Sequence, residues 1–158
     1  MNKAIKNPFA QLYSHNDYKC FGCSPFNKIG LQMTFIDLGD KIESPQQQFE
    51  GFSKILHGGI QATLQDEISS WYLFTKCGTS GMTKSIHIEY LKPVYVTDNE
   101  IRITAEKINI EEKLITLKIK LFNAEGTLCS EAEIVYYIFP EAVAKRKHFY
   151  PGVEKFYD

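Results

Sequence analysis

The sequence lacks a long hydrophobic run and an excess of charge of either sign. Its longest apolar stretch, IVYYIF (134–139), is too short to span a bilayer. The opening residues, MNKAIKNPFAQLY, lack the apolar core of a signal peptide. A net charge of −1 over 158 residues gives no support for a nucleic-acid binder. We therefore expect one cytoplasmic domain with no membrane and no nucleic-acid partner, large enough to bury its own core.

Cysteine is scarce, and its four positions do not form a complete motif. Cys20 and Cys23 make a CxxC pair, but no second CxxC or HxxxH completes a tetrahedral zinc site, and His15 is only a conceivable third ligand. A redox pair is expected at a helix start after a strand, whereas CFGCSPFNKIG is rich in turn residues. We favour reduced structural thiols, with metal binding and redox chemistry left as alternatives.

The spacing of apolar residues changes period twice along the chain. A short helix is predicted at 3–13, and an alternating pattern from Leu31 turns at 38–41 and returns through 42–50, which indicates a hairpin. A helix is predicted at about 57–76, ended by glycines. Four alternating segments follow, at 85–91, 100–108, 114–122 and 127–139. This order predicts an α+β fold in which an antiparallel sheet curls around one long helix.

The predicted helix carries two apolar patches. At 100° per residue, one stripe contains Ile60, Leu64, Ile68, Trp71 and Phe74. Glu67 falls inside this stripe, while Asp66 lies about 100° to one side, in the second patch with Ala62, Ser70 and Leu73. Two patches suggest two partners, so we expect the helix to contact its own sheet and a second subunit.

Three segments together carry a family resemblance: HGGIQATLQDE (57–67), TKSIHIEYLKPV (83–94) and CFGCSPFNKIGLQM (20–33). They resemble the hot-dog-fold acyl-CoA thioesterases, most closely the phenylacetate-pathway (PaaI-like) branch of the 4-hydroxybenzoyl-CoA thioesterase superfamily. The resemblance covers about residues 20–139, between an N-terminal extension (1–19) and a C-terminal tail (140–158). It implies a five- or six-stranded antiparallel sheet wrapped around one helix, and a homodimer or homotetramer. It also implies acyl-CoA hydrolysis without metal or cofactor, CoA being part of the substrate.

The resemblance also implies roles for individual residues. His57, Gly58 and Gly59 would form the turn into the helix, and Asp66 would be the catalytic carboxylate. Thr83 stands where relatives have a Ser or Thr near the thioester. Some members have an assisting Asn six residues before the His.

In this sequence, the position of that Asn is Gly51, so the assisting role is vacant or filled elsewhere.

Physical chemistry supports the same residues. A helix N-terminus offers unpaired N–H groups to a developing oxyanion, and Gly58 lets the carbonyl approach the backbone. Asp66 would activate water as a general base, or attack the carbonyl itself to give a mixed anhydride. Eight residues of helix separate Gly58 from Asp66 by about 12 Å, too far for one reacting group. We therefore expect Gly58 of one chain to act with Asp66 of the other.

Three alternatives stay open at this point. Glu67 either supports Asp66 or is itself the base, because its place in the apolar stripe predicts burial. A hot-dog hydratase or dehydratase, or a non-catalytic acyl-CoA-binding module, would use the same fold. The basic cluster 145–147 either meets CoA phosphates or lies in solvent. The pattern does not indicate which acyl group is bound.

Overall fold

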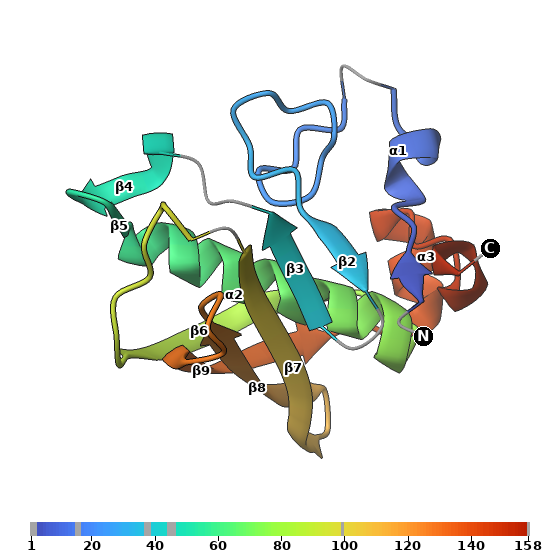
Figure 1. Ribbon diagram of the computed structural model, residues 1–158. Coiled ribbons are helices and arrows are strands. Elements are labelled where there is room, and N and C mark those ends of the chain that lie inside the picture. Colours follow the sequence, from blue (N-terminus) through green and yellow to red (C-terminus); the bar gives the residue numbers. More distant parts are fainter. Residues whose placement is uncertain (1–2, 15–16, 37–38, 44–46, 99, 158) are drawn as a thin grey trace.

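The computed structural model describes residues 3–14, 17–36, 39–43, 47–98 and 100–157 (Figure 1). The strands of the main sheet are β1 (Ala4–Ile5), β2 (Thr34–Ile36), β3 (Gly39–Glu43), β6 (Gly81–Tyr90), β7 (Glu100–Glu111), β8 (Leu114–Phe122) and β9 (Leu128–Ile138). The short strands β4 (Glu50–Phe52) and β5 (Ile55–Leu56) pair with each other. The helices are α1 (Phe9–Leu12), α2 (Gly58–Tyr72) and α3 (Glu141–His148), with the helical turns η1 (Gln47–Phe49), η2 (Leu73–Cys77) and η3 (Val153–Phe156).

The main sheet is antiparallel throughout and packs against the long helix α2. Its strand order is β1-β2-β3-β7-β8-β9-β6. Helix α2 lies along one face of the sheet and contacts β6, β7, β8 and β9 (Figure 1). The predicted hot-dog arrangement is therefore confirmed. None of the described helices is long and apolar enough to cross a membrane.

The inner face of the sheet is built by strict alternation. In β8, every second side chain is fully buried: Ile115, Leu117, Ile119 and Leu121. Burial of each such side chain stabilises the fold by about 1.5–3 kcal/mol. Because the period is two residues, the intervening side chains point to the wetter outer face, as the sequence predicts.

Helix α2 presents its predicted apolar stripe to this face. Leu64, Ile68 and Trp71 are buried, and the Trp71 ring stacks on Phe35 of β2 with 4.0 Å between ring centroids. The helix continues into the π-helical turn η2 and ends at Gly78, whose φ of 65° is left-handed. This ending agrees with the sequence prediction, because glycine adopts that conformation without strain.

The sheet has more strands than predicted. Among the described residues it has seven rather than five or six. The extra strand is β1, which pairs with β2 from within the segment predicted as a helix at 3–13; only Phe9–Leu12 of that segment is helical. A two-residue strand has no detectable period, and its partner lies about thirty residues away in sequence. The predicted turn at 38–41 includes Leu38, outside the described residues, and β3 already begins at Gly39.

The second apolar patch of the helix does not call for a second subunit. Leu73, at the centre of that patch, is fully buried within its own chain and packs beside Gly81 of β6. Ser70 contacts the hydroxyl of Tyr136 on β9. The curved sheet of the same chain covers this sector of the helix, and contact of the helix with a second subunit stays a prediction. Any argument for a dimer must therefore come from another surface.

The C-terminal tail packs on the same core. Phe156 in η3 is fully buried, and its ring lies 5.5 Å from Trp71, 5.7 Å from Phe74 and 5.9 Å from Phe9, between centroids. The hydroxyl of Tyr150 donates to the carbonyl of Phe74 (2.9 Å). The tail and the N-terminal segment thus complete the aromatic end of the core.

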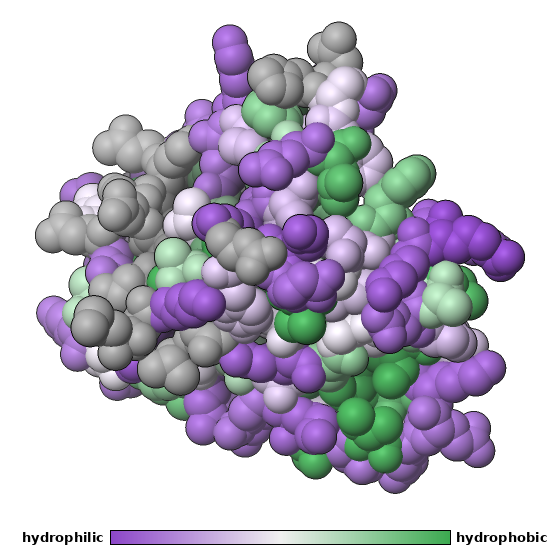
Figure 2. Space-filling view, turned by 90° about the vertical axis from the view of Figure 1, so that its right-hand side faces the viewer, coloured by the Kyte–Doolittle hydropathy of each residue, from purple (hydrophilic) through white to green (hydrophobic). Residues whose placement is uncertain are grey.

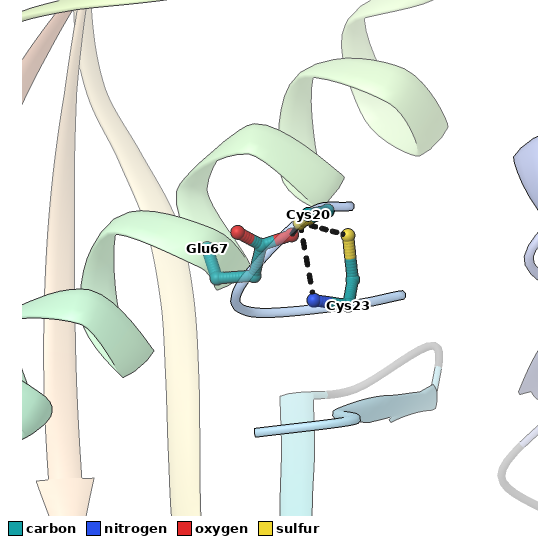
Figure 3. Close-up of side chains that lie close together, drawn as sticks. All are labelled: Cys20, Cys23 and Glu67. Carbon is teal, nitrogen blue, oxygen red and sulfur yellow. Dashed lines mark hydrogen bonds between the residues drawn. The ribbon is translucent and has the colours of Figure 1, made fainter. Parts of the chain in front are cut away.

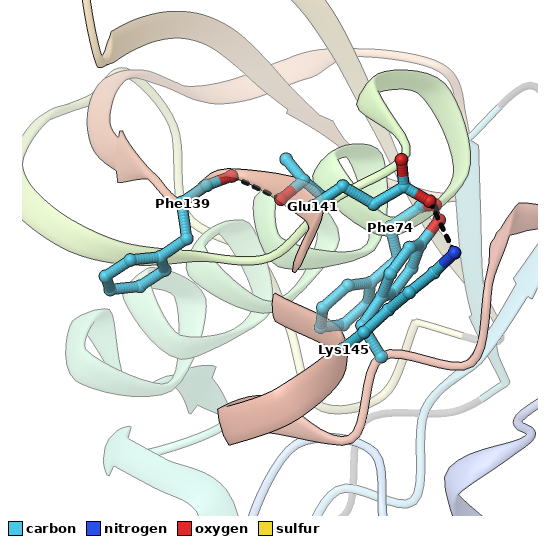
Figure 4. Close-up of polar contacts among 6 residues, drawn as sticks. Phe74, Phe139, Glu141 and Lys145 are labelled. Atoms are coloured by element: carbon cyan, nitrogen blue, oxygen red, sulfur yellow. Dashed lines mark hydrogen bonds and ion pairs between the residues drawn. The ribbon is translucent and has the colours of Figure 1, made fainter. Parts of the chain in front are cut away.

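Helix α3 lies outside this aromatic group. Lys145 of the basic cluster forms an ion pair with Glu141 on its own helix, with 2.8 Å between Nζ and Oε1 (Figure 4). The side of the molecule that carries α1 and α3 is mostly hydrophilic (Figure 2). Part of the basic cluster is therefore engaged within α3.

Replacement Phe156→Ala should lower the free energy of unfolding by about 3–5 kcal/mol, because it empties a fully buried aromatic site. Phe149→Ala is the matched control, since that side chain is 57% exposed, and should change stability by less than about 1 kcal/mol. Urea denaturation measures both. If Phe156→Ala lowered the free energy of unfolding as little as Phe149→Ala, the tail would not be part of the core.

Candidate functional site

The start of α2 is a capped helix end with a free donor. His57 is the N-cap, and its Nδ1 accepts a hydrogen bond from the N–H of Gly59 (2.8 Å). The N–H groups of Ile60 and Gln61 both donate to the carbonyl of His57. Within the described residues, the N–H of Gly58 has no acceptor. This arrangement leaves Gly58 as the donor available to an anion at the positive end of the helix.

Tyr90, on the edge strand β6, lies over this helix end. Its hydroxyl donates to the carbonyl of Gly58 (2.8 Å), and a Cβ on Gly58 would lie 3.3 Å from the Tyr90 ring. Glycine at this position therefore gives the strand room beside the first helical turn.

A hollow of about 350 Å³ lies at the same end of the helix. Its lining residues are Gln48, Phe49, Glu50, His57, Gly59 and Ile60. It combines the ring of Phe49 and the side chain of Ile60 with the polar helix end. A ligand with an apolar part and a polar acceptor fits these surroundings.

Asp66 lies two turns further along α2 and is held by two hydroxyl groups. Its Oδ1 accepts from Tyr136 of β9 (2.6 Å) and from Thr83 of β6 (2.9 Å). No donor in the described part of the chain reaches Oδ2. The carboxylate is half-buried, with one oxygen fixed and the other free to accept a proton.

Tyr136 is a site residue that the sequence did not reveal. Burial, and next the neighbouring Asp66, raise the pKa of its hydroxyl far above the usual range, so the group stays protonated and donates. Its alternation with buried Ile134 indicated an inward side chain, and a buried tyrosine needs a partner. The identity of that partner depends on how β9 crosses the helix.

Glu67 points toward the loop that contains the CxxC pair (Figure 3). Its Oε1 accepts from the indole N–H of Trp71 (3.2 Å) and from the thiol of Cys20 (3.5 Å). Burial raises the pKa of Glu67, and these hydrogen bonds partly offset the rise. Glu67 is therefore partly buried, and the two adjacent carboxylates lie in different surroundings.

Gly51 stands where some relatives have an assisting Asn. A Cβ at Gly51 would lie 2.9 Å from Cα of His57, closer than real side chains approach. An asparagine there would displace the N-cap. The departure from the family pattern therefore accompanies a close contact between β4 and the helix start.

The structure thus forms two groups from the predicted residues. His57, Gly58 and Gly59 lie together at the helix start, and Asp66 and Thr83 lie together two turns away. Strand β6 runs alongside both groups, since Tyr90 contacts the first and Thr83 the second. Within one chain the two groups remain apart.

Comparison with known proteins shows which proteins this chain resembles in sequence and in fold. Residues 53–130 match the family model of the thioesterase superfamily. A hypothetical thioesterase from Streptococcus pneumoniae, solved with coenzyme A, is 22% identical with a TM-score of 0.58, over 65% of this chain and 82% of that chain.

A Bacillus halodurans protein solved with CoA is 18% identical with a TM-score of 0.62, over 74% of this chain and 78% of that one. Zebrafish thioesterase superfamily member 2 is 24% identical with a TM-score of 0.57, over 65% and 75%. At these identities the likeness shows a shared fold. A search of curated proteins gave no match.

Replacement Tyr136→Phe should lower the free energy of unfolding by about 1.5–3 kcal/mol, because it removes a hydrogen bond to a carboxylate. Tyr137→Phe is the control on the same strand, where the side chain is partly exposed, and should change stability by less than about 0.5 kcal/mol. Denaturation at neutral pH compares the two. Identical stabilities would mean that Tyr136 does not hold Asp66.

Proposed function

We propose that this chain, whose residues 53–130 match the family model of the thioesterase superfamily, hydrolyses acyl-CoA thioesters to a carboxylic acid and CoA. One observation carries the proposal: Asp66 is fixed through Oδ1 by Thr83 and Tyr136, while Oδ2 is left free. A carboxylate held in one orientation with one open oxygen is suited to act on a bound water.

The free N–H of Gly58 supplies the second requirement of the reaction. When a nucleophile attacks a thioester carbon, negative charge develops on the carbonyl oxygen. A backbone donor at a helix N-terminus stabilises this developing charge more strongly than it stabilises the partial charge on the carbonyl oxygen of the bound substrate. The neighbouring hollow of about 350 Å³ gives the acyl group a place beside that donor.

The proposed reaction needs no group beyond water and the chain itself. Asp66 Oδ2 takes a proton as the water oxygen bonds to the carbonyl carbon. The tetrahedral intermediate then breaks its C–S bond, and the CoA thiolate recovers the proton from Asp66. Direct attack by Asp66, giving an anhydride that water opens, uses the same geometry.

The solved structures that resemble this chain include two variants of one protein. For the Streptococcus pneumoniae protein there are structures with one aspartate and with one threonine replaced by alanine. The hydrogen-bonded pair in this chain is also an aspartate and a threonine, Asp66 and Thr83.

The two halves of the site require a second copy of the chain, and strand β6 is the surface for it. In the described part of the sheet, β6 pairs with β9 on one side and with no strand on the other. Its exposed apolar side chains include Met82, Ile86 and Tyr90. A long unpaired edge with apolar side chains favours strand pairing with another chain.

Antiparallel pairing of two β6 strands would unite the groups. A bulge between Thr83 and Ser85 turns Thr83 to the same face as Tyr90. With the twofold axis at His87, and the bulge counted as one extra residue, Thr83 of one copy lies opposite Tyr90 of the partner subunit. Asp66 would then lie near Gly58 of the partner subunit, so that each dimer contains two shared sites.

Replacement Asp66→Asn should lower kcat on the best acyl-CoA by about 10²–10⁴, because the base is lost while the size of the side chain is kept. Affinity for the substrate should change much less. Thiol release from a series of straight-chain, branched and aryl acyl-CoAs measures activity and identifies the acyl group. Glu67→Gln is the neighbouring control and should cost less. Full activity of the Asp66 variant would refute the assignment.

Replacement Ile86→Lys should turn the dimer into a monomer, because it places two ammonium groups close to each other on either side of the proposed twofold axis. Activity should fall with dimer content, since each site loses half its groups. Light scattering and turnover are measured on the same samples. Ile29→Lys, at a loop position that is 74% exposed, is the control and should remain dimeric and active. An active Ile86→Lys monomer would contradict the shared site.

A further inference from the structure

Cys20, Cys23 and Glu67 form a compact group on the side of α2 that faces the N-terminal loop (Figure 3). Their Sγ and carboxylate oxygen atoms all lie within 4.8 Å of one another. The two cysteines come from one turn of the loop, and the glutamate comes from the long helix. No step of the proposed hydrolysis uses any of them.

The carboxylate of Glu67 is placed in unusual surroundings. It is only partly exposed, and it contacts a thiol and the indole of Trp71. No Lys, Arg or His in the described ranges forms an ion pair with it. Buried carboxylates are normally paired with a cation or coordinate a metal. Among the described residues, the neighbours of this carboxylate are thus a thiol and an indole, and no cation.

The loop is shaped to approach Glu67 closely. A Cβ at Gly22, between the two cysteines, would lie 2.5 Å from Oε2 of Glu67, so only glycine fits there without movement. The N–H of Cys23 donates to the sulfur of Cys20 (3.2 Å). Backbone N–H groups of this kind orient and stabilise a thiolate that acts as a metal ligand.

The distances separate two possible uses of the cysteine pair. The sulfurs lie 2.8 Å apart, which is longer than the bond of about 2.05 Å in a disulfide and shorter than the roughly 3.8 Å between two sulfurs on a tetrahedral zinc ion. The position of Glu67 favours a metal site over a disulfide. Its oxygen lies 3.5 Å from the sulfur of Cys20, matching the separation of about 3.5 Å expected for sulfur and oxygen ligands on one such ion. In a disulfide, the sulfur of Cys20 would have no proton to donate to this carboxylate.

We propose that Cys20, Cys23 and Glu67 bind one divalent cation of the zinc class. Two thiolates and a carboxylate favour zinc or cobalt over magnesium or calcium. The described residues supply three ligands, and water completes the tetrahedron. The two sulfurs move apart by about 1 Å, a side-chain rotation, on binding. The ion fastens the loop to α2 one residue from Asp66, so that it stabilises the helix that carries the proposed base.

The test is a cobalt titration of the full chain. Protein kept reduced and stripped of metal should bind one Co²⁺ per chain, with a thiolate-to-cobalt band in the near ultraviolet and visible bands typical of tetrahedral Co²⁺. Added Zn²⁺ should abolish these bands and raise the melting temperature. Absence of the thiolate band would overturn the proposal, as would isolation of the reduced-buffer protein with a Cys20–Cys23 disulfide shown by mass spectrometry.

Variants assign the ligands. Cys20→Ser should abolish the thiolate band or lower the affinity for cobalt at least about tenfold. Glu67→Gln should lower the affinity for cobalt by about 10–100-fold. Cys77→Ser is the control, because Cys77 lies in η2, outside the group, and it should bind cobalt as the parent chain does. Parent-like affinity in Glu67→Gln would remove Glu67 from the site and overturn the three-ligand assignment. Circular dichroism checks that each variant is folded. The cobalt titration of the parent chain tests the proposal without relying on any variant.

Discussion

The packing of α2 inside the curved sheet is the constraint on which the rest of the structure depends. Trp71 and its neighbours fix the helix against the inner face, and Phe156 closes its C-terminal end. Once the helix is fixed in this way, its N-terminus and Asp66 are held at defined points beside β6. The chemistry therefore depends on a rigid element whose orientation is set by burial of apolar side chains.

Two adjacent carboxylates on this helix have different surroundings because 100° of rotation separates them. Asp66 points to the sheet, where two hydroxyl groups hold one of its oxygens. Glu67 points to the loop, where its neighbours are sulfur atoms and an indole. This division explains why Asp66 is suited to activate water beside the sheet, and why Glu67 is suited to bind a cation beside the loop.

Much of this arrangement could be predicted from the sequence because it rests on local periodicity. Alternation predicted β8 and β9, and the switch to a helical period at His57 predicted α2. The family resemblance indicated that Thr83 lies near the thioester, and in the structure its hydroxyl donates to Asp66.

The missed features all involve pairs that are distant in sequence. Tyr136 and Asp66 are 70 residues apart, and Cys20 and Glu67 are 47 apart. Neither pair leaves a periodic trace, because each depends on the register in which the sheet and the loop meet α2. The two-residue strand β1 was missed for the same reason.

The most direct measurement is a crystal structure with a non-hydrolysable acyl-CoA analogue in which a methylene replaces the thioester sulfur. The account predicts that the analogue's carbonyl oxygen accepts from the N–H of Gly58 in one subunit. Its carbonyl carbon should lie within about 3–3.5 Å of a water held by Asp66 of the partner subunit. An analogue whose carbonyl lies away from Asp66, or is bound by groups of a single chain, would contradict the account.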